Sequence, residues 1–452
     1  MAQHDVTLEE IVSLAKQRGL IFPGSEIYGG LAGTWDYGPH GATLKNNIKR
    51  LWWKRFVDDR EDMYGLDAAI LMNEKVWEAS GHTGAGFADP LVEDLKTKKR
   101  YRADHLLEEN KVDPTGMTLE QMTAAFKEHG IVSPDKNPLS EVRQFNMMFK
   151  TEVGVLGGQF SYLRPETAQG IFVNFKNVVD SMQPKIPFGI AQIGKAFRNE
   201  ITPREFVFRT REFEQMEIEY FVHPGEWEKA FDHWLNQMRG WMDEVGIEKT
   251  RTHEVVIGEE DRAHYSTKTI DFEFDFPFGK KELFGLAYRT DFDLKNHTEH
   301  SGTKLQYRDD VKGEVFTPHV IEPTFGVDRA LLALLVSSYK KDVVGGEERA
   351  YLAFKKDIAP VRVMVSPLLK NKPELQEKAR EVFSMLKKEF GNVMYDDNGN
   401  IGKRYRRQDE IGTPYCVTID FETLEGQGVT VRHRDTAEQE RVTIEELISK
   451  VS

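Results

Sequence analysis

Residues 197–213 read FRNEITPREFVFRTREF, and this stretch decides the fold. Apolar segments at 188–197 and 212–221 flank it and predict two strands joined by a short loop. Four arginines crowd that loop: Arg198, Arg204, Arg209 and Arg211. Because a guanidinium fork can contact a phosphate at two points, the loop indicates a phosphate site. The alternative is a surface hairpin that is held together by salt bridges.

The second of these strands has two different faces. Apolar and polar residues alternate along it, with Met216, Ile218 and Tyr220 on one face and Phe213, Gln215, Glu217 and Glu219 on the other. Alternate residues of a strand point to opposite faces of the sheet. Burying a carboxylate without a partner is costly. We therefore expect the glutamate face to be wet or filled by a ligand.

A second constellation follows at 320–329, which reads VIEPTFGVDR. The pattern predicts the end of a strand, a glycine turn and a helix that carries Arg329 in its first turn. A helix N-terminus together with an arginine binds anions readily. A plain strand-to-helix connection with a surface arginine is the alternative.

The other hydrophobic patterns predict a mixed α and β protein. Helices are predicted at 7–18, 40–57, 168–179, 227–245, 326–339 and 373–390. Further strands are predicted at 66–72, 160–163, 269–276, 283–292, 315–321, 361–365, 415–421 and 428–433. Thr7 and Glu10 form a capping-box pattern at the start of the first helix. The helix at 40–57 is apolar over a wide surface, which suits a core face or a subunit interface.

Length and charge suggest how the chain is divided. A chain of 452 residues exceeds what one core usually serves. The net charge of −13 lies entirely in residues 1–354, because residues 355–452 hold 17 basic and 17 acidic side chains. We place a domain boundary near 355, and we interpret the charged, loop-rich stretch at 90–144, with a short helix from Thr118, as an insertion. A basic cluster at 403–407 could contact nucleic acid or could be a solvated surface turn.

Several classes of protein are excluded by what the sequence lacks. It has no P-loop, no strand followed by G-x-G-x-x-G, no H-E-x-x-H, no C-x-x-C and no G-x-S-x-G. Its only cysteine, Cys416, permits no internal disulfide and no multi-cysteine metal site. No apolar run reaches the roughly 18 residues of a membrane span, and residues 1–5 do not resemble a signal peptide. We therefore expect a cytoplasmic protein without a membrane partner.

The arginine-rich loop has a close parallel in a known family. Phe197-Arg198-Asn199-Glu200, followed by Arg209 and Phe213, resembles motif 2 of the class II aminoacyl-tRNA synthetases. Gly326-Val327-Asp328-Arg329 is similar to motif 3, and the helix from Pro39 has the place of motif 1, which lies at the dimer interface. Longer strings resemble glycyl-tRNA synthetases of the homodimeric type: residues 22–30, 34–39, 77–82, 163–169 and 213–217. Residues after about 355 look like the anticodon-binding domain that the glycine, histidine, proline and threonine enzymes share.

The resemblance implies a fold and an activity. The fold would be α+β, with a catalytic domain at 1–354 built on an antiparallel sheet with flanking helices, the insertion at about 90–144, and an α/β anticodon-binding domain at 355–452. The protein would be a homodimer. It would activate glycine with ATP and Mg²⁺ to glycyl-adenylate and transfer the glycine to the 3′ end of its tRNA.

The resemblance also assigns an ATP site. Arg198, Glu200 and Arg329 would be catalytic, with Arg198 at the α-phosphate and Arg329 at the terminal phosphate. Phe213 would stack on adenine, and Glu282 would approach Mg²⁺. The full set would be Arg198, Asn199, Glu200, Phe208, Arg209, Thr210, Arg211, Glu212, Phe213, Glu282, Leu283, Gly326, Val327, Asp328 and Arg329.

A glycine site is implied beside it. Glu166, Glu217 and Glu322 would surround the ammonium group, with Thr324 nearby, where many relatives have serine. Arg102 resembles a further substrate-site arginine. The full set would be Arg102, Glu166, Phe213, Glu214, Gln215, Met216, Glu217, Glu322, Pro323, Thr324, Phe325 and Gly326.

This chemistry suits the side chains that the sequence offers. The substrate carboxylate attacks the α-phosphate, so the enzyme needs positioning and charge neutralisation rather than its own nucleophile. Glycine can be selected by refusing anything larger, so no editing domain is expected. Many relatives carry half of a small zinc site just before Arg102, but residues 94–100 hold no cysteine, so no zinc is predicted.

Three alternatives stay open at this point. A histidine, proline or threonine enzyme would share motifs 2 and 3 but should lack the three-glutamate pocket. A non-catalytic nucleic-acid-binding protein on the same scaffold would be expected to lose Arg198, Glu282 or Arg329. Synthesis of dinucleoside polyphosphates as a side reaction is not decided by the sequence.

Overall fold

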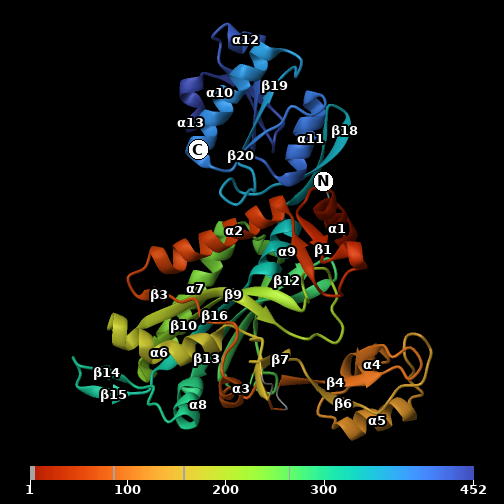
Figure 1. The fold of residues 1–452 in the computed structure, drawn as a ribbon, viewed down its shortest axis with the longest axis vertical. Helices are drawn as coiled ribbons and strands as arrows, with labels where there is room; N and C mark the ends of the chain where they lie inside the picture. The colour runs from red at the N-terminus through yellow and green to blue at the C-terminus, as the bar shows by residue number, and fades with distance from the viewer. Residues whose placement is uncertain (1–5, 85–86, 156–157, 264) are drawn as a thin grey trace.

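A computed structural model describes residues 6–84, 87–155, 158–263 and 265–452. The expectation about a leader at 1–5 lies outside the described residues. The centre of the molecule is a seven-stranded sheet in the order β11-β12-β13-β16-β10-β9-β3 (Figure 1). The strands are β3 (Met63–Gly65), β9 (Phe188–Phe197), β10 (Glu212–Val222), β11 (Thr252–Val256), β12 (Lys268–Phe276), β13 (Gly279–Thr290) and β16 (His319–Gly326).

The antiparallel sheet that the sequence predicted is present, with one exception at its edge. Strand β3 pairs with β9 in the parallel sense, from Met63 opposite Gly189 to Gly65 opposite Ala191. The five other pairs between neighbouring strands are antiparallel. A short edge strand that runs the other way makes the sheet mixed.

The prediction of a strand at 66–72 is wrong. The strand ends at Gly65, and the chain after it leaves the sheet because side chains bind its backbone. The carboxamide oxygen of Gln192 accepts from the Ala68 amide at 2.6 Å, and Arg164 donates to the Ala68 carbonyl at 2.8 Å. Leu71, which is half exposed, makes only an isolated bridge to Leu163.

The strand predicted at 315–321 merged two elements. Residues 314–316 form β15 (Glu314–Phe316), which pairs with β14 (Tyr307–Asp309) in a separate hairpin. The central strand β16 begins at His319 and continues to Gly326, where α9 (Val327–Ser338) starts at once. The second constellation is therefore a long strand that leads directly into a helix.

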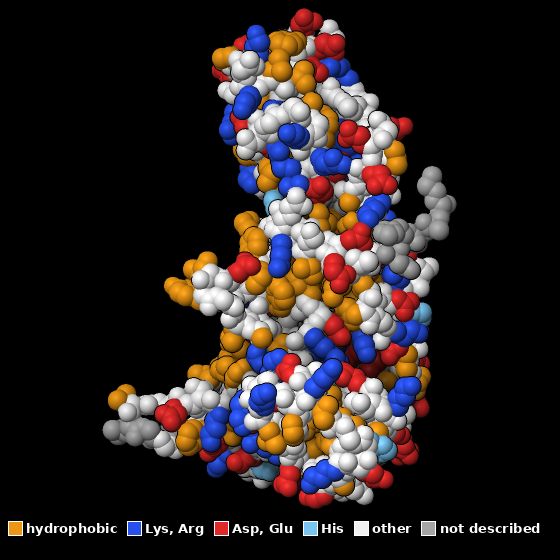
Figure 2. Space-filling model, turned by 90° about the vertical axis from the view of Figure 1, so that its right-hand side faces the viewer, with side chains coloured by type: hydrophobic (Ala, Val, Ile, Leu, Met, Phe, Trp, Pro, Cys, Tyr) orange, Lys and Arg blue, Asp and Glu red, His pale blue; other side chains and the backbone are white. Residues whose placement is uncertain are grey.

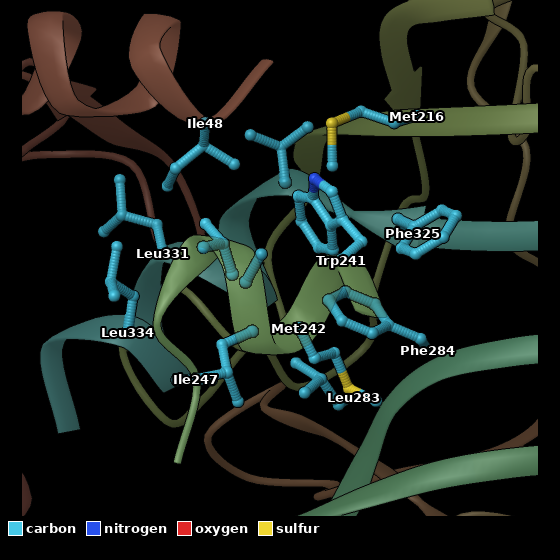
Figure 3. Packing of buried hydrophobic residues seen from close by; sticks show 14 of the residues in the cluster. Ile48, Met216, Trp241, Met242, Ile247, Leu283, Phe284, Phe325, Leu331 and Leu334 are labelled. Atoms are coloured by element: carbon cyan, nitrogen blue, oxygen red, sulfur yellow. The ribbon is translucent and has the colours of Figure 1, made fainter. Parts of the chain in front are cut away.

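One face of the sheet is covered by α2 (Pro39–Trp53), α7 (Trp227–Val245) and α9, and the main core lies between them and the strands (Figures 1 and 3). The ring of Trp241 on α7 lies 5.1 Å from Phe325 on β16 and 5.6 Å from Phe284 on β13. The wide apolar surface of α2 serves this core, because Ile48 and Trp52 are fully buried. A π-helical turn, η2 (Lys54–Asp58), continues α2 and brings Phe56 into the same core.

The opposite face carries α6 (Ala168–Met182) and α8 (Phe292–Ser301), with a second apolar cluster around Phe188 and Phe221. The predicted helices are confirmed, including α1 (Leu8–Gln17), whose N-cap Thr7 forms the capping box with Glu10. Smaller elements complete this part of the molecule: β1 (Ile21–Pro23), η1 (Glu26–Tyr28), β2 (Trp35–Tyr37), α3 (Glu74–Ala79), β7 (Lys150–Val153), β8 (Gln159–Tyr162), η4 (Pro224–Glu226) and η5 (Lys249–Arg251).

The stretch expected to be an insertion folds as a small unit at the edge of the molecule (Figure 1). It contains β4 (Ala88–Glu93), β5 (Arg100–Arg102), α4 (Ala103–Glu109), α5 (Leu119–Glu128) and β6 (Arg143–Asn146). Its own apolar cluster includes Val92, Leu107 and Phe126. Thr118 caps α5, as the sequence predicted for a helix that starts there.

The turn at residues 94–100, which holds no cysteine, is closed by Asp94. Its carboxylate is buried and accepts from the amides of Lys96 and Thr97 at 2.8 Å. It also accepts from Ser133 at 2.5 Å and from Asn137 at 3.0 Å, both on the far side of the unit. Asp94 therefore joins two segments by hydrogen bonds.

The C-terminal residues form a five-stranded sheet in the order β20-β19-β21-β22-β23 with a core of its own. Its elements are β19 (Val363–Pro367), α10 (Pro373–Phe390), β20 (Val393–Tyr395), α11 (Ile401–Ile411), β21 (Tyr415–Ile419), α12 (Phe421–Leu424), β22 (Val429–His433), β23 (Gln439–Val442) and α13 (Ile444–Val451). A hairpin of β17 (Tyr339–Val344) and β18 (Glu347–Leu352) precedes it, and Figure 1 places the module at one end of the molecule.

The basic cluster at 403–407 is part of α11, so the interpretation as a surface turn is wrong. Arg404 is buried and donates to Ser366 and to the carbonyl of Pro367. Arg407 forms an ion pair with Asp396 at 2.6 Å. These two arginines hold the module together. None of the helices in the described part of the chain combines the length and the apolar character that a bilayer crossing requires.

Candidate active site

A cavity of about 510 Å³ opens on the glutamate face of β10, between the insertion and the central strands. The odd-numbered residues of β10 from Phe213 to Glu217 line it, as do β13 and β16. Arg102 of the insertion and Tyr265 of the loop before β12 contribute from outside the sheet. Sequence segments that are far apart thus meet at the position that the alternation of β10 indicated.

One end of the cavity is rich in arginine. Arg198, Arg209 and Arg329 all line it, together with Phe208 and Phe213. The guanidinium of Arg329 stacks 4.5 Å from the ring centre of Phe208, and it lies 3.1 Å from the carboxylate of Glu282. The guanidinium of Arg198 lies 5.5 Å from the ring centre of Phe213. This end can hold an anionic group beside an aromatic face.

The loop that carries Arg198 and Arg209 is fixed by backbone hydrogen bonds. The Arg198 amide donates to the Arg211 carbonyl at 3.0 Å, and the Arg211 amide donates to Gly33 at 2.8 Å. Nε of Arg198 donates to the Pro165 carbonyl at 3.1 Å. Because the loop is held from both sides, the arginines are placed before any ligand arrives.

The other end of the cavity is lined by carboxylates. Glu166, Glu217 and Glu322 are each at most 9% exposed, and all three line the cavity. Thr324 donates to Glu217 at 3.0 Å, and Thr167 donates to the other oxygen of Glu217 at 2.5 Å. The carboxylates come from three elements: the turn before α6, β10 and β16. Such an end suits a small cation.

The charges at this end are only partly neutralised. Arg289 on β13 donates to Glu322 at 2.6 Å and to both oxygens of Asp293. Burial raises the pKa of Glu217, and the neighbouring Glu166 raises it further. Burial also tends to raise the pKa of Glu166, but His82, 3.3 Å away, and Arg289 outweigh it and hold this pKa well below its usual value.

Comparison with known proteins identifies the family. The glycine–tRNA ligase of Caldanaerobacter subterraneus subsp. tengcongensis is 52% identical over 452 residues, covering 98% of this chain and 97% of the relative. The ligase of Alkaliphilus metalliredigens is equally similar, and that of Bacillus anthracis is 51% identical with the same coverage. The chain belongs to the glycine–tRNA ligase family. The family predicted from the motifs is confirmed.

Two family models agree with this assignment to the glycine–tRNA ligase family, and one solved structure shares the fold. Residues 149–339 match the class II tRNA synthetase core domain of the G, H, P, S and T enzymes, and residues 362–452 match the anticodon-binding domain. The prolyl-tRNA synthetase of Cryptosporidium parvum, solved with halofuginone and AMPPNP, superposes with a TM-score of 0.66 at 15% identity. The superposition covers 100% of this chain and 78% of the prolyl-tRNA synthetase chain, which supports the α+β class II fold.

Most residues that the resemblance assigned to the ligase site do line the cavity. They are Arg102, Glu166, Arg198, Glu200, Phe208, Arg209, Thr210, Phe213, Glu214, Gln215, Glu217, Glu282, Leu283, Glu322, Thr324, Gly326, Asp328 and Arg329. Asp328 and Glu214 line it while their carboxylates contact α2. Lys45 lies 2.7 Å from Asp328 and 2.9 Å from Glu214.

The structure places other predicted residues elsewhere. Met216, Phe325 and Val327 are fully buried in the main core: Met216 and Phe325 point to the opposite face of the sheet, and Val327 lies in the first turn of α9. A side-chain contact with ATP or glycine is therefore excluded for them, and only their backbone could contribute. The remaining ones are not in the cavity lining: Asn199, Arg211, Glu212 and Pro323.

Arg211 and Glu212 have other partners. The guanidinium of Arg211 donates to the carbonyls of Ala32 and Glu200, so it fixes the loop rather than faces the cavity. The carboxylate of Glu212 pairs with Lys195 on the neighbouring strand and is exposed. Both residues support the motif 2 hairpin from outside.

Sequence reasoning missed several residues of this site. Arg289, Tyr265 and Asp271 were not predicted, although the Arg289 guanidinium stacks 3.7 Å from the Tyr265 ring centre and Asp271 lines the cavity. A charged residue at the end of the apolar run Leu286-Ala287-Tyr288 was a usable signal for Arg289. Tyr265 lies in a loop without periodicity, so no local pattern could have indicated it.

Proposed function

We infer that this protein charges tRNA with glycine. Family membership supports the activity, and one observation carries it: a single cavity holds arginines at one end and three buried carboxylates at the other. ATP brings negative charge, and the glycine ammonium brings positive charge. The two ends place the glycine carboxylate between them, where the α-phosphate would lie.

We propose that Glu166, Glu217 and Glu322 bind the glycine ammonium. Thr324 and Thr167 orient the carboxylate of Glu217, since each donates to one of its oxygens. Arg289 orients Glu322 in the same way. Buried and pre-oriented acceptors hold an ammonium well, because little reorganisation is needed on binding.

The arginine end is proposed to bind ATP. Arg198 would contact the α-phosphate and Arg329 the terminal phosphate, while Phe213 would stack on adenine. During attack, one phosphorus–oxygen bond forms to the glycine carboxylate, and the bond to the leaving pyrophosphate breaks. Fixed cationic groups neutralise the charge that develops on the phosphate oxygens.

The cavity also fits a magnesium ion bound with ATP. Glu282 and Asp271 face it from neighbouring strands, and burial together with the nearby Glu282 raises the pKa of Asp271 to about 7. Two carboxylates that repel each other beside a phosphate site are a suitable donor set for a hard divalent cation. We propose that Glu282 holds Mg²⁺ with Asp271 alongside, where the ion would neutralise phosphate charge.

We also propose which part of the chain performs each function. The catalytic domain would comprise about 1–354, with the insertion at about 90–144, and the anticodon-binding domain about 355–452. The separate core of the C-terminal module supports this division. tRNA for glycine would bind to both parts.

Homodimer formation through the motif 1 region is proposed as well. Ile27, Tyr28 and Leu31, on the loop between β1 and β2, are 89%, 88% and 61% exposed. Figure 2 shows hydrophobic side chains gathered at mid-height of one face, below the C-terminal module. A partner subunit would remove such surface from water. We place the enzyme in the cytoplasm, where its tRNA would be used.

The test is amino-acid-dependent exchange between ATP and pyrophosphate, with Mg²⁺ and each of the twenty amino acids in turn. Exchange with glycine alone is the expected result. Exchange with another amino acid would overturn the assignment of the pocket, and exchange with none would favour the non-catalytic alternative.

A further inference from the structure

Glu219 is a buried carboxyl group that the reaction described above does not use. It lies on β10, two residues beyond Glu217 on the same face and opposite Ile190 of β9. Its side chain is fully buried, and within the described residues neither carboxyl oxygen has a hydrogen-bond partner. Glu219 is also absent from the cavity lining. The expectation that the whole glutamate face is wet or ligand-filled is therefore wrong for this residue.

The carboxyl of Glu219 is aimed at the carboxylates that line the cavity. One carboxyl oxygen of Glu217, one of Glu219 and one of Glu322 lie within 4.8 Å of one another. Glu219 thus forms a second layer beneath the proposed ammonium site.

The other charged groups around this cluster are few. Arg289 faces it from β13, but its guanidinium donates to Glu322 and to Asp293 of α8. His297 of α8 binds the carboxamide of Gln169 on α6. Glu166 lies beyond these, paired with His82, and Tyr265 packs against Arg289.

Acidic groups therefore outnumber basic ones in a buried volume. Five carboxyls (Glu166, Glu217, Glu219, Glu322 and Asp293) surround the guanidinium of Arg289, while His82 lies beside Glu166 and the buried Arg164 lies near Glu217. Full ionisation would place several like charges in a low dielectric, which is very unfavourable. Burial, and then the charge of Glu322, raise the pKa of Glu219 well above that of an ordinary glutamate. Burial also raises the pKa of Glu322, and the charges of Glu217, Glu166 and Asp293 add to this effect while Arg289 opposes it. Some of these carboxyls must hold protons when the pocket is empty.

We propose that Glu219 and Glu322 together hold one proton while the pocket is empty, and that the ammonium of bound glycine displaces it. On binding, an O–H bond of the pair breaks and the proton leaves to solvent. An N–H group of the ammonium then donates to the freed Glu322 oxygen. The ammonium takes the place of the proton as the positive charge beside the carboxyl pair, and the carboxylate of glycine points toward the arginine end. This inference rests on the proposed glycine site, and it makes Glu219 a positioning residue that acts through Glu322.

A measurable consequence is that glycine binding releases protons. The affinity for glycine should therefore rise with pH until the pair is ionised, and then level off. Removing the carboxyl of Glu219 removes a like charge from the cluster. Glu322 should then lose its proton at lower pH, and glycine should bind without proton release near neutral pH.

The experiment compares the wild-type protein with Glu219→Gln, which keeps the shape and removes the charge. The first measurement is the heat of glycine binding in two buffers of different ionisation enthalpy, which gives the number of protons released. The second is kcat/KM for glycine in pyrophosphate exchange, from about pH 5.5 to about pH 9. Glu254→Gln is the matched control, because Glu254 is exposed on edge strand β11 and pairs with Arg239 at the surface.

Proton release by the wild-type protein and its loss in Glu219→Gln are the expected results. The acid limb of kcat/KM should move down by about one pH unit in Glu219→Gln, which is about a tenfold gain at acid pH. Proton release on ATP binding and the pH profile of kcat/KM for ATP should be unchanged in Glu219→Gln. Glu254→Gln should match the wild-type protein in proton release and in its pH profile. Wild-type binding without proton release, or an unmoved acid limb in a folded Glu219→Gln protein, would overturn the proposal.

Two further outcomes separate this inference from the function on which it rests. If the wild-type protein shows no glycine-dependent exchange, the proposed function fails. If the wild-type protein is active but folded Glu219→Gln no longer binds glycine, Glu219 itself contacts the ammonium, and the shared-proton proposal fails alone. Wild-type binding without proton release would overturn the proposal even if Glu219→Gln does not fold.

Discussion

The ammonium of Lys45 lies 2.7 Å from the carboxylate of Asp328, and both side chains are buried. This ion pair joins α2, the motif 1 helix, to the first turn of α9, the motif 3 helix. Asp328 also accepts from the Glu214 amide at 2.7 Å and from the Tyr37 hydroxyl. Because Arg329 follows Asp328 and Phe213 precedes Glu214, the pair holds two residues of the proposed ATP site.

Lys45→Met should therefore damage stability and ATP binding together. The variant leaves Asp328 buried without its cation, which costs about 3–5 kcal/mol of unfolding free energy when a buried pair is broken. KM for ATP should rise more than KM for glycine. Urea unfolding and exchange kinetics check this, with Lys54→Met as control, since Lys54 pairs with Asp59 at the surface. Equal effects of the two variants would contradict the role of the pair.

Arg198→Ala should abolish adenylate formation while the protein stays folded and keeps its oligomeric state. Removing one preorganised cationic contact to a reacting phosphate typically lowers kcat by about 10²–10³ or more. Arg198→Lys should recover only part of this, because lysine cannot form the two-point contact. Single-turnover formation of glycyl-adenylate is the measurement, and normal activation by Arg198→Ala would refute the motif 2 assignment.

Much of this site could be predicted because the relevant signals are local. Alternation along 212–221 separated Met216, which is in the core, from Glu217, which is in the cavity. The motif spacing placed Arg198 and Arg329 in one site. The pattern could not show that Glu219 is sealed off from the cavity, because that depends on what packs above it.

The predictions that failed depend on contacts between residues that are far apart in the sequence. Residues 66–72 are apolar enough for a strand, but Gln192 and Arg164 satisfy the backbone at Ala68 in place of a ladder partner. Those side chains are more than 90 residues away in sequence. Arg289 and Tyr265 likewise meet only in the folded chain.

Asp94→Ala should loosen the insertion without affecting glycine activation directly. The change leaves the amides of Lys96 and Thr97 and the side chains of Ser133 and Asn137 without their acceptor. Asp94→Asn should be milder, because it keeps one acceptor oxygen. Limited proteolysis between 90 and 144, followed by mass spectrometry, should show faster cleavage in Asp94→Ala than in Asp135→Ala, which changes an exposed aspartate of the same unit.

The pH dependence of this effect follows from the direction of the pKa shift. Burial works against ionisation of Asp94, but its hydrogen bonds outweigh it, so its pKa in the folded protein is well below the ordinary value. Its contribution to stability is therefore complete above the pKa in the unfolded chain, about 3.9, and is lost as pH falls through the lower folded pKa. The difference between wild type and Asp94→Ala should shrink at acid pH, and a difference independent of pH would exclude an ionised Asp94.

Truncation tests the proposed domain division, and the structure indicates where to cut. Phe354, Ile358 and Ala359 belong to the main core around the seven-stranded sheet. Phe354 lies beside the boundary expected near 355, and the other two residues follow it. Asn47 on α2 donates to the carbonyls of Ile358 and Ala359, at 3.0 and 3.1 Å. A chain that ends at 354 should therefore be less stable than one that ends at 360.

The chain that ends at 360 should still activate glycine but charge tRNA poorly. It keeps the whole cavity lining and loses the five-stranded module that matches an anticodon-binding domain. It also exposes the surface around Arg18, which forms an ion pair with Glu410 in that module. Pyrophosphate exchange and tRNA charging, measured on the same preparation, separate the two functions. If exchange is lost while circular dichroism shows an intact fold, the module contributes to activation, and the proposed division would have to be abandoned.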